Sequence, residues 1–338
     1  MAIIGITLRN GRIETAFDGA PGEGALAQAA AEAPAASPIV FLIHGFLFDP
    51  HPPTGGYRDR RRHPHRLILS AAPNAQRAPR RLSSWPIAMG FRAGTTDDGL
   101  AVGVGWPSLP IGRDGLAFGA GLFRRAYDEA ALAAATLSRA IRIAALARPG
   151  APVEILAHSL GARVALLALR QAAAGGFAHR IGRVLLLNPA EYRAEAALAA
   201  RAVAGSGPQV VNVISRENDL FDALLQVFGP CAAQPLGAAG LSGEFSDWLD
   251  LQLDHPRTLH WLAGRGVAPR RRRICHWSSY TRPGLFAFYS KLLRDRETIA
   301  RLEAAGAPRD LEHRWARVTP AAPKLSRLAP IRPQLADS

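Results

Sequence analysis

The stretch VEILAHSLGARVAL, at residues 153–166, places a serine where a short apolar run meets a helix-forming run. A serine at a sharp turn between a buried strand and a helix presents its hydroxyl above the sheet, and the turn needs small residues two positions before and two after it. Ala157 and Gly161 take those positions around Ser159, with alanine where a glycine is more usual. We therefore expect Ser159 to act as a nucleophile.

Two backbone N–H groups are expected to face the developing negative charge. The first N–H groups of the following helix, beginning at Leu160, point back toward the serine and carry the positive end of the helix dipole. A second donor is expected in FLIHGF, where a strand that ends in His44-Gly45 directs the N–H of Phe46 into the space above the sheet. Phe46 and Leu160 are the predicted donors of an oxyanion hole.

A nucleophilic serine also needs a base and an acid that orients the base. Where a nucleophilic serine lies in a strand–turn–helix of this kind, the order along the chain is serine, acid, histidine. The segment SRENDLFDALL follows a predicted strand and offers the acid. Asp219 lies a few residues beyond the strand end and is the preferred candidate, with Asp222 and Glu217 as alternatives.

His276 is the preferred base. It follows a short apolar step and precedes an amphipathic helix in RRICHWSSYTRPGLFAFYSKLL. His255 and His260 are nearer to the acid along the chain, but they lie in a less regular stretch that contains proline. Cys275 and Trp277 would flank the ring of the base and help to fix it.

The sequence favours neither a metal nor a cofactor. His51, His63 and His65 are separated by prolines and arginines and match no metal-ligand spacing. A Gly-x-x-x-x-Gly-Lys phosphate loop is absent from the sequence. Cys231 and Cys275 allow at most one disulfide, so a reducing compartment is expected.

Apolar runs of strand length alternate with helix-forming stretches. The runs are continuously apolar, as in strands buried on both faces of a parallel sheet. This order predicts an α/β fold with a mostly parallel sheet flanked by helices. The predicted strands are residues 38–43, 99–106, 153–157, 183–188 and 209–214, and the clearest helices are residues 124–147, 160–174 and 191–203.

The chain is expected to open with a β-hairpin, because Asn10-Gly11 separates two alternating runs within residues 3–17. Two segments are predicted to leave the sheet. Residues 47–92, rich in Pro, Arg and His, are interpreted as a lid-like insertion, and residues 229–272 as a second excursion.

We predict a single domain over residues 1–317, followed by a proline-containing tail at residues 318–338. The N-terminal run has no basic segment before it and is too short for a signal sequence, and the sequence predicts no membrane span. A cytoplasmic protein is expected.

The chain carries 41 Lys and Arg against 27 Asp and Glu, a net charge of +14. Only Lys291 and Lys324 are lysines, and alanine is abundant, so this balance indicates a general compositional bias. Because basic residues are not interleaved with aromatic ones, nucleic acid is not expected as a partner. A peripheral contact with an anionic membrane surface, through the arginines of residues 58–62, is another use of the charge.

These motifs together resemble the α/β-hydrolase superfamily, and more narrowly a bacterial serine-esterase-like branch of largely uncharacterised function. The resemblance runs from about residue 38 to residue 294. It is carried by LIHGF, VGWPS, the pair Tyr127-Asp128, AHSLG, ISRENDLFDALL and HWSSYTRPGLFAFY.

The resemblance implies a triad of Ser159, Asp219 and His276, with backbone donors after Gly45 and after Ser159. It implies carboxylesterase- or lipase-like cleavage of a small-molecule or lipid ester through an acyl-enzyme, without a cofactor. The alternative function is a non-catalytic protein of the same fold that binds an anionic partner through the Arg-rich residues 47–92. The complete set of serine, acid and histidine favours the enzyme.

Overall fold

The computed structural model describes residues 3–16, 20–48, 84–92, 94, 97–108, 120–295 and 297–319. Most of the predicted insertion at residues 47–92 and nearly all of the predicted tail lie outside these residues. The same holds for the three histidines considered above as metal ligands and for the arginines of residues 58–62.

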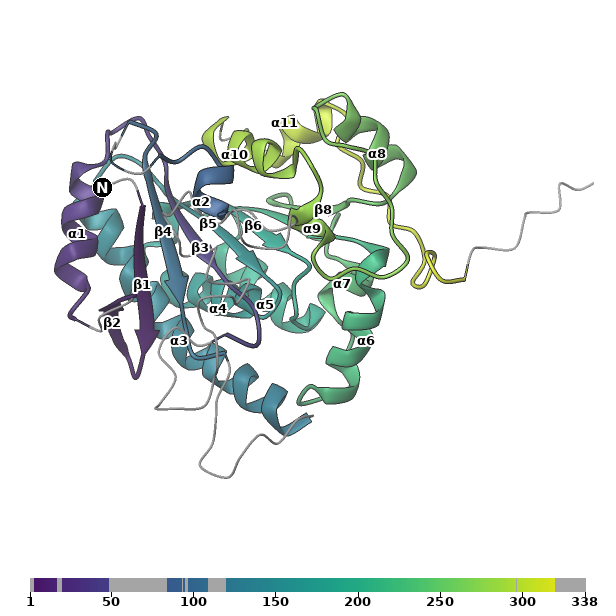
Figure 1. The fold of residues 1–338 in the computed structure, drawn as a ribbon, viewed down its shortest axis with the longest axis horizontal. Helices are drawn as coiled ribbons and strands as arrows, with labels where there is room; N and C mark the ends of the chain where they lie inside the picture. The colour runs from purple at the N-terminus through teal and green to yellow at the C-terminus, as the bar shows by residue number, and fades with distance from the viewer. Residues whose placement is uncertain are drawn as a thin grey trace, which may run out of the picture.

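One eight-stranded sheet forms the centre of the molecule (Figure 1). Its strands are β1 (Ile3–Arg9), β2 (Arg12–Thr15), β3 (Ile39–Ile43), β4 (Leu100–Gly105), β5 (Val153–His158), β6 (Ile181–Leu187), β7 (Gln209–Ile214) and β8 (Trp248–Gln252). They lie in the order β2-β1-β4-β3-β5-β6-β7-β8. Only the pair β1 and β2 is antiparallel, so the mostly parallel sheet predicted from the sequence is confirmed.

The predicted N-terminal hairpin is also confirmed. Asn10 and Gly11 form the turn between β1 and β2, with φ angles of 48° and 71°. Both residues adopt the left-handed conformation that a two-residue hairpin turn requires. Strand β1 then pairs in parallel with β4, which joins the hairpin to the main sheet.

The prediction that residues 229–272 leave the sheet was wrong for part of the segment. Its middle forms β8, which pairs in parallel with β7 at the sheet edge. Asp250 within β8 is buried and accepts hydrogen bonds from Asn212 Nδ2 at 2.6 Å and from Trp248 Nε1 at 3.0 Å. These partners satisfy a carboxylate in a strand that the sequence pattern alone marks as too polar for a core.

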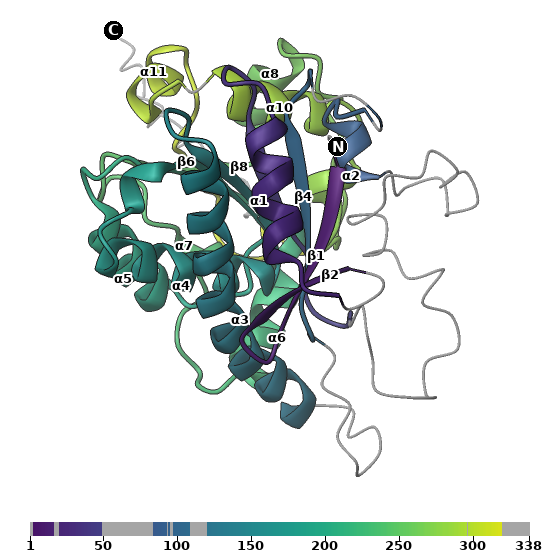
Figure 2. The same ribbon diagram turned by 90° about the vertical axis from the view of Figure 1, so that its left-hand side faces the viewer.

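Helices cover both faces of the sheet. They are α1 (Glu23–Glu32), α2 (Trp85–Ala88), α3 (Ala120–Ala147), α4 (Gly161–Ala174), α5 (Arg193–Val203), α6 (Asp219–Phe228), α7 (Leu236–Ala239), α8 (Pro256–Ala263), α9 (Ser278–Thr281), α10 (Leu285–Asp295) and α11 (Ile299–Ala304). Figure 2 shows α1, α3 and α4 along one side, where α3 packs against both of the others. Buried residues of α8, α10 and α11 belong to the core on the other face.

The strands divide their side chains between these two cores. In β3, Ile39, Phe41 and Ile43 join the core under α1, α3, α4 and α5, whereas Val40 and Leu42 join the other. Successive side chains of a strand point to opposite faces, so a strand buried on both sides must be apolar at every position. This explains why the strand runs in the sequence are continuous.

Helix α3 is long and apolar enough to cross a membrane by length and composition alone. Just over half of the qualifying window, 56%, is buried inside the fold, and the helix packs against α1 and α4. Buried core helices of soluble proteins commonly pass the same test. The packing of α3 accounts for its composition without a membrane.

The last described segment, residues 310–319, is fastened to the body of the protein. Arg216 Nε donates to the carbonyl of Glu312 at 2.8 Å, and Arg317 Nε pairs with Asp254 at 2.7 Å. The N–H of Trp315 donates to the carboxylate of Asp219. This segment therefore supplies partners for charged groups that are buried next to β7 and α6.

Candidate active site

Ser159 lies between β5 and α4 in a strained turn. Its φ of 55° is a left-handed conformation that residues other than glycine, asparagine and aspartate seldom adopt. The turn is held on both sides, because the Ser159 N–H donates to the Leu187 carbonyl at 3.0 Å and its carbonyl accepts from Ala162 and Ala190, each at 3.0 Å. Such strain persists only where the surroundings fix it, which is common at functional sites.

Gly161 meets the requirement for a small residue after the serine. A Cβ atom at this position would lie 2.4 Å from the carbonyl oxygen of His44, at the end of β3. Because this neighbour is backbone, no side-chain movement could relieve the clash. On the other side of the serine, Ala157 is fully buried in β5. The two small residues let the turn sit directly against the neighbouring strand.

The structure brings His276 to Ser159, although 117 positions separate them along the chain. The His276 Nε2 atom lies 2.9 Å from Ser159 Oγ. Asn188 Nδ2 donates to the His276 carbonyl at 2.8 Å, and the ring of Phe221 stacks on the imidazole with centroids 4.5 Å apart. These contacts fix both the backbone and the ring plane of the histidine.

Asn218, rather than Asp219, faces the other ring nitrogen. Its Oδ1 lies 2.7 Å from His276 Nδ1. Asp219 instead lies 3.4 Å from Arg216 Nη1 and accepts from the N–H of Trp315. The side chains of successive residues in a helical turn point about 100° apart, so Asn218 and Asp219 face different parts of the protein. The contact with His276 that was expected of Asp219 is thus made by Asn218. The prediction considered only carboxylates for this role and therefore did not include Asn218.

Asp222 fixes the orientation of the Asn218 amide. Asn218 Nδ2 donates to Asp222 Oδ1 at 3.1 Å, which leaves Asn218 Oδ1 to face His276. An amide oxygen only accepts, so His276 carries its proton on Nδ1 and directs the lone pair of Nε2 at Ser159. Burial and the nearby Asp219 raise the pKa of Asp222 to about 7. Any proton can reside on Asp222 Oδ2, which has no partner among the described residues, so Oδ1 accepts in either state.

Glu217, the other alternative for the acid, holds the loop that carries the base. Its Oε1 accepts from the Arg272 N–H at 2.7 Å, and its carbonyl accepts from the Cys275 N–H at 2.8 Å. Burial raises the pKa of Glu217, which lies 3.6 Å from Arg282 Nη2. The two ends of the site, residues 217–218 and 275–276, are therefore joined by backbone as well as side-chain bonds.

The two alternative histidines lie at helix α8. His255 caps its N-terminus, where Nδ1 accepts from the N–H of Arg257 at 3.3 Å, and His260 lies within the helix. Burial lowers the pKa of His255. The histidine beside Ser159 in the structure is thus the one that the sequence favoured.

The site contains two electrically neutral imidazoles at ordinary pH. Burial lowers the pKa of His276 to about 4, and burial with the adjacent His276 holds the pKa of His158 well below its usual value. The two rings lie 4.7 Å apart. Because the group on His276 Nδ1 is an uncharged amide, it adds no negative charge that would raise the pKa of the base.

The loop after β3 is held in one orientation by His44 and Ser108. His44 Nε2 accepts from the Trp106 N–H at 3.0 Å, so its proton lies on Nδ1, which donates to the Gly45 carbonyl at 2.8 Å. Ser108 Oγ lies 2.8 Å from the same carbonyl oxygen. In a trans peptide the N–H and the C=O point in opposite directions, so the Phe46 N–H points away from the groups that hold the Gly45 carbonyl.

The two predicted donors have free N–H groups. Among the described residues, neither the Phe46 N–H nor the Leu160 N–H donates a hydrogen bond, and Leu160 is the N-cap of α4. Gly45 brings the first of them close, because a Cβ at this position would lie 3.2 Å from Ser159 Oγ. Both groups thus remain available beside the serine.

Ser159 and His276 open into an apolar pocket of about 360 Å³, which we call the serine pocket. Its walls come from the loop after β3, the start of α3, helix α6 and the loop before α9. The larger side chains that line it include Phe46, Phe123, Phe221, Leu224, Phe228 and Trp277. The pocket suits an apolar group attached to the atom that the serine would attack.

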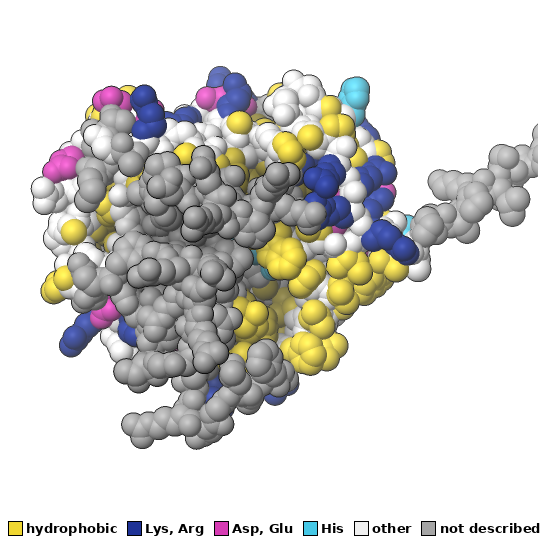
Figure 3. Space-filling model, in the orientation of Figure 1, with side chains coloured by type: hydrophobic (Ala, Val, Ile, Leu, Met, Phe, Trp, Pro, Cys, Tyr) yellow, Lys and Arg dark blue, Asp and Glu magenta, His cyan; other side chains and the backbone are white. Residues whose placement is uncertain are grey.

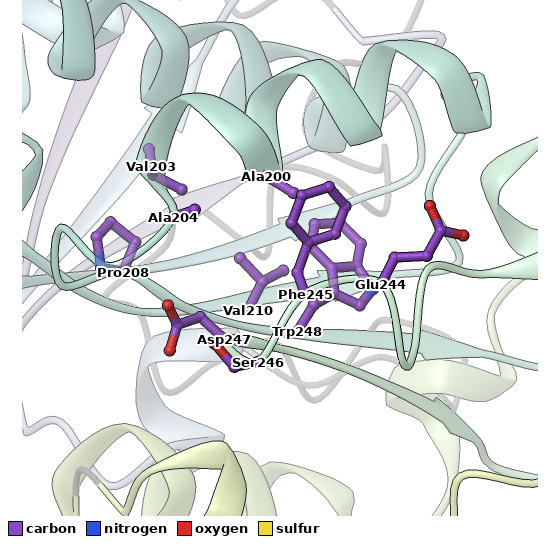
Figure 4. Close-up of a pocket in the computed structure, with 10 residues that line it drawn as sticks. All are labelled: Ala200, Val203, Ala204, Pro208, Val210, Glu244, Phe245, Ser246, Asp247 and Trp248. Atoms are coloured by element: carbon purple, nitrogen blue, oxygen red, sulfur yellow. The ribbon is translucent and has the colours of Figure 1, made fainter.

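A second pocket of about 180 Å³ lies at the opposite ends of β7 and β8, and we call it the amino-end pocket (Figure 4). In Figure 4 the carboxylates of Glu244 and Asp247 lie on either side of the rings of Phe245 and Trp248. Asp247 accepts from Gln209 Nε2 at 2.6 Å and from the Gly205 N–H at 3.1 Å, and Glu244 pairs with Arg193. Its polar groups are therefore engaged within the fold.

Across the described ranges, no three His, Cys, Asp or Glu side chains approach closely enough to hold a metal ion. The two cysteines are both free, with Cys231 exposed and Cys275 buried beside the base.

Comparison with protein families agrees with the fold. The sequence model of a family described as "Alpha/beta hydrolase of unknown function (DUF900)" matches residues 91–221, which run from before β4 into α6 and include Ser159 and Asn218. The chain has the α/β-hydrolase fold, and its residues 91–221 are similar to this family. No curated protein matches the sequence.

Proposed function

We propose that this α/β-hydrolase is a serine esterase that cleaves carboxylic esters through an acyl-enzyme. The observation that carries the proposal is the chain of contacts from Ser159 Oγ to His276 Nε2 at 2.9 Å and from His276 Nδ1 to Asn218 Oδ1 at 2.7 Å. This chain ends at a strained serine in the largest apolar pocket described above. A nucleophile, a base and a group that orients the base is the minimum set for this reaction.

In the first step, His276 Nε2 takes the proton of Ser159 Oγ as the oxygen attacks the ester carbonyl carbon. The carbonyl oxygen becomes an oxyanion, which accepts hydrogen bonds from the Phe46 and Leu160 N–H groups. When the tetrahedral intermediate collapses, the bond from carbon to the alcohol oxygen breaks. His276 then returns its proton to the departing alkoxide, so an alcohol leaves and the acyl group stays on Ser159.

In the second step, water replaces the alcohol. His276 takes one proton from the water, and the hydroxyl attacks the acyl carbon. Collapse of the second intermediate breaks the bond to Ser159 Oγ, which regains the proton from His276. The products are a carboxylic acid and the free enzyme, and the reaction needs no cofactor.

Asn218 gives this mechanism an unusual orienting group. A carboxylate at this place would both hold the tautomer of the histidine and stabilise its cation. Asn218 performs the first task, since Asp222 fixes its amide, but it stabilises the cation only through the amide dipole. Asp222 adds a charge only in its ionised form, and only through one intervening residue. The base is consequently weaker and remains neutral at lower pH.

The central test is labelling with a fluorophosphonate probe, which reacts with activated serines. Wild type should be labelled and should cleave p-nitrophenyl esters, whereas Ser159→Ala should lose both properties. Ser246→Ala, which changes an exposed serine of the amino-end pocket, is the matched control and should behave as wild type.

Equal labelling of wild type and Ser159→Ala, or no labelling together with no ester turnover, would contradict the proposal. The second result would favour the non-catalytic alternative, in which the same fold binds an anionic partner.

A further inference from the structure

Helix α6 buries its acidic residues and exposes several apolar ones, the reverse of the usual pattern. Its acidic residues Asp219 and Asp222 are 1% and 2% exposed, whereas Val227 is 66% exposed. Leu220, Leu224 and Phe228 also reach the surface, each more than one third exposed. A helix on a soluble protein normally buries its apolar stripe and exposes its charges. The outer face of α6 is therefore suited to an apolar environment.

This apolar surface continues around the mouth of the serine pocket. Trp277 and Ile274 are each 50% exposed, and Leu47 is 42% exposed. Leu224 and Phe228 line the pocket with one side and face outward with the other, as does Trp277. Figure 3 shows hydrophobic side chains gathered over the position of α6. We call the exposed apolar residues of α6 with Leu47, Ile274 and Trp277 the α6 rim.

Arginines border the α6 rim. Residues 270–273 are four consecutive arginines that directly precede Ile274, and Arg270, Arg271 and Arg273 are exposed. Among the described residues these three form no ion pair with a carboxylate, in contrast to Arg216 and Arg282, which pair with buried acids. Figure 3 shows Lys and Arg side chains next to the hydrophobic ones. The surface thus combines unpaired positive charge with exposed apolar side chains.

We infer that the α6 rim and these arginines dock the enzyme on an anionic lipid surface, from which an acyl chain enters the serine pocket. The apolar side chains insert among the acyl chains, while the arginines remain at the level of the anionic headgroups. An exposed apolar patch bordered by charge is typical of such a contact. The substrates are then lipid esters, an inference that rests on the proposed esterase function.

Docking also explains how the pocket meets its substrate. The residues that form the rim are on the same elements as the pocket walls, namely α6 and the loops after β3 and before α9. A lipid held under the rim would therefore move its ester group toward Ser159 along an apolar path. The four arginines lie within six positions of His276 along the chain, so the charged border lies on the loop that carries the base.

The test separates docking from catalysis by measuring vesicle binding with Ser159→Ala, which cannot turn over lipid by the proposed mechanism. This protein should co-sediment with vesicles of equimolar phosphatidylcholine and phosphatidylglycerol, and only weakly with phosphatidylcholine alone. Rising salt should weaken binding to the anionic vesicles, because the arginine contacts are screened. These measurements need no change in the rim itself.

Variants in the Ser159→Ala background then locate the surface. Replacing Arg270, Arg271 and Arg273 with Gln should weaken binding about 100-fold, at about fivefold for each arginine. The matched control replaces the exposed Arg12, Arg201 and Arg301, which lie on other elements, and removes the same net charge. The control should bind the vesicles nearly as the parent does.

A second pair of variants tests the apolar part of the surface. Leu220→Gln with Val227→Gln changes two rim residues outside the pocket lining and should weaken binding about tenfold. The control is Leu132→Gln with Leu146→Gln, which changes two leucines of α3 that are each 66% exposed. Melting curves of all variants verify that they are folded.

Three outcomes would overturn the inference. These are no binding of Ser159→Ala to anionic vesicles, equal losses in the rim and control variants, and a lipid-free dimer that Leu220→Gln with Val227→Gln dissociates. The last result would show that a second copy of the chain covers the rim. Each outcome leaves the esterase proposal intact, because that proposal depends on probe labelling and ester turnover.

Discussion

The serine pocket and the amino-end pocket lie at opposite edges of the same parallel sheet, yet they are built differently. The loops that leave β3, β5 and β6 at the serine pocket contain Leu47, Ser159 and Asn188 with φ angles of 69°, 55° and 43°. At the amino-end pocket the left-handed positions of the loop before β7 are Gly205 and Gly207. Glycine adopts this conformation without strain, asparagine at a small cost, and leucine or serine at a larger one.

The difference indicates where side chains are needed in strained positions. Ser159 supplies the hydroxyl, and Asn188 binds the His276 carbonyl with its amide. Neither contact is available to glycine. At the amino-end pocket the loop only has to turn, and Asp247 then stabilises the turn by accepting from the Gly205 N–H. At the serine pocket the strained residues supply side chains for the candidate chemistry. At the amino-end pocket the carboxylate contacts stabilise the fold.

The largest difference between the two pockets is expected when one key side chain is removed from each. His276→Ala should lower kcat/KM for a soluble ester by about 10⁴-fold to 10⁶-fold, since the serine loses its base. The melting temperature of His276→Ala should stay close to that of the wild type. Asp247→Ala should leave kcat/KM unchanged but lower the free energy of unfolding by about 1 kcal/mol, because the Gly205 N–H and Gln209 Nε2 lose their acceptor. Loss of activity in Asp247→Ala would refute the division of roles.

The second prediction concerns the pair that orients the base. In Asp222→Asn the new amide can donate to Asn218 Oδ1, which lets the Asn218 amide turn its NH₂ group toward His276. That geometry favours a proton on Nε2, so kcat should fall about 10²-fold while KM changes little. Adding Asn218→Asp should recover most of the lost kcat, because a carboxylate only accepts hydrogen bonds and so keeps the proton on His276 Nδ1. Steady-state kinetics of the two single variants and the double variant would test this, and a purely structural role of Asp222 predicts no recovery.

The third prediction concerns the pH dependence of kcat/KM, where the smallest effect at neutral pH is expected. The pKa of His276 is lowered to about 4 by burial, so the base stays neutral and active as the pH falls to about that value. The wild-type kcat/KM for an uncharged ester should therefore decline only near pH 4, well below the usual histidine pKa of about 6.5. Asn218→Asp places a carboxylate beside His276 Nδ1 and should raise the pH of this decline by about 1–3 units. A wild-type limb near pH 6.5 would contradict the neutral environment described for His276.

Much of the fold could be predicted because its determinants are local in the sequence. Continuous apolar runs predicted five of the central strands, and Asn10-Gly11 predicted the hairpin. Strand β8 was missed because its polar residues are buried in contacts with partners from elsewhere in the chain. Asp250 is acceptable in the core only once Asn212 from β7 lies beside it. A sequence pattern contains no such partner.

The candidate site was predictable to different degrees for a related reason. Ser159 could be identified from its small neighbours, since the turn imposes them within a few positions. The partner of His276 depends on the phase of the turn that enters α6, and one position there separates Asn218 from Asp219. Asn188 was missed altogether, since an asparagine after a strand has no pattern of its own. Its positive φ and its contact with His276 became visible only in the structure.

The segment that contains Trp315 and Arg317 has a consequence for the order of events during synthesis. Asp219, adjacent to Asn218, accepts from the Trp315 N–H, and Asp254 pairs with Arg317. On a ribosome, the serine, the asparagine and the histidine all emerge before these partners exist. The buried carboxylates beside the site would meanwhile lack their final contacts, so the site should reach its finished geometry only when residues 310–317 have been released. We therefore expect assembly of this protein to finish with one of the last described parts of the chain to be made.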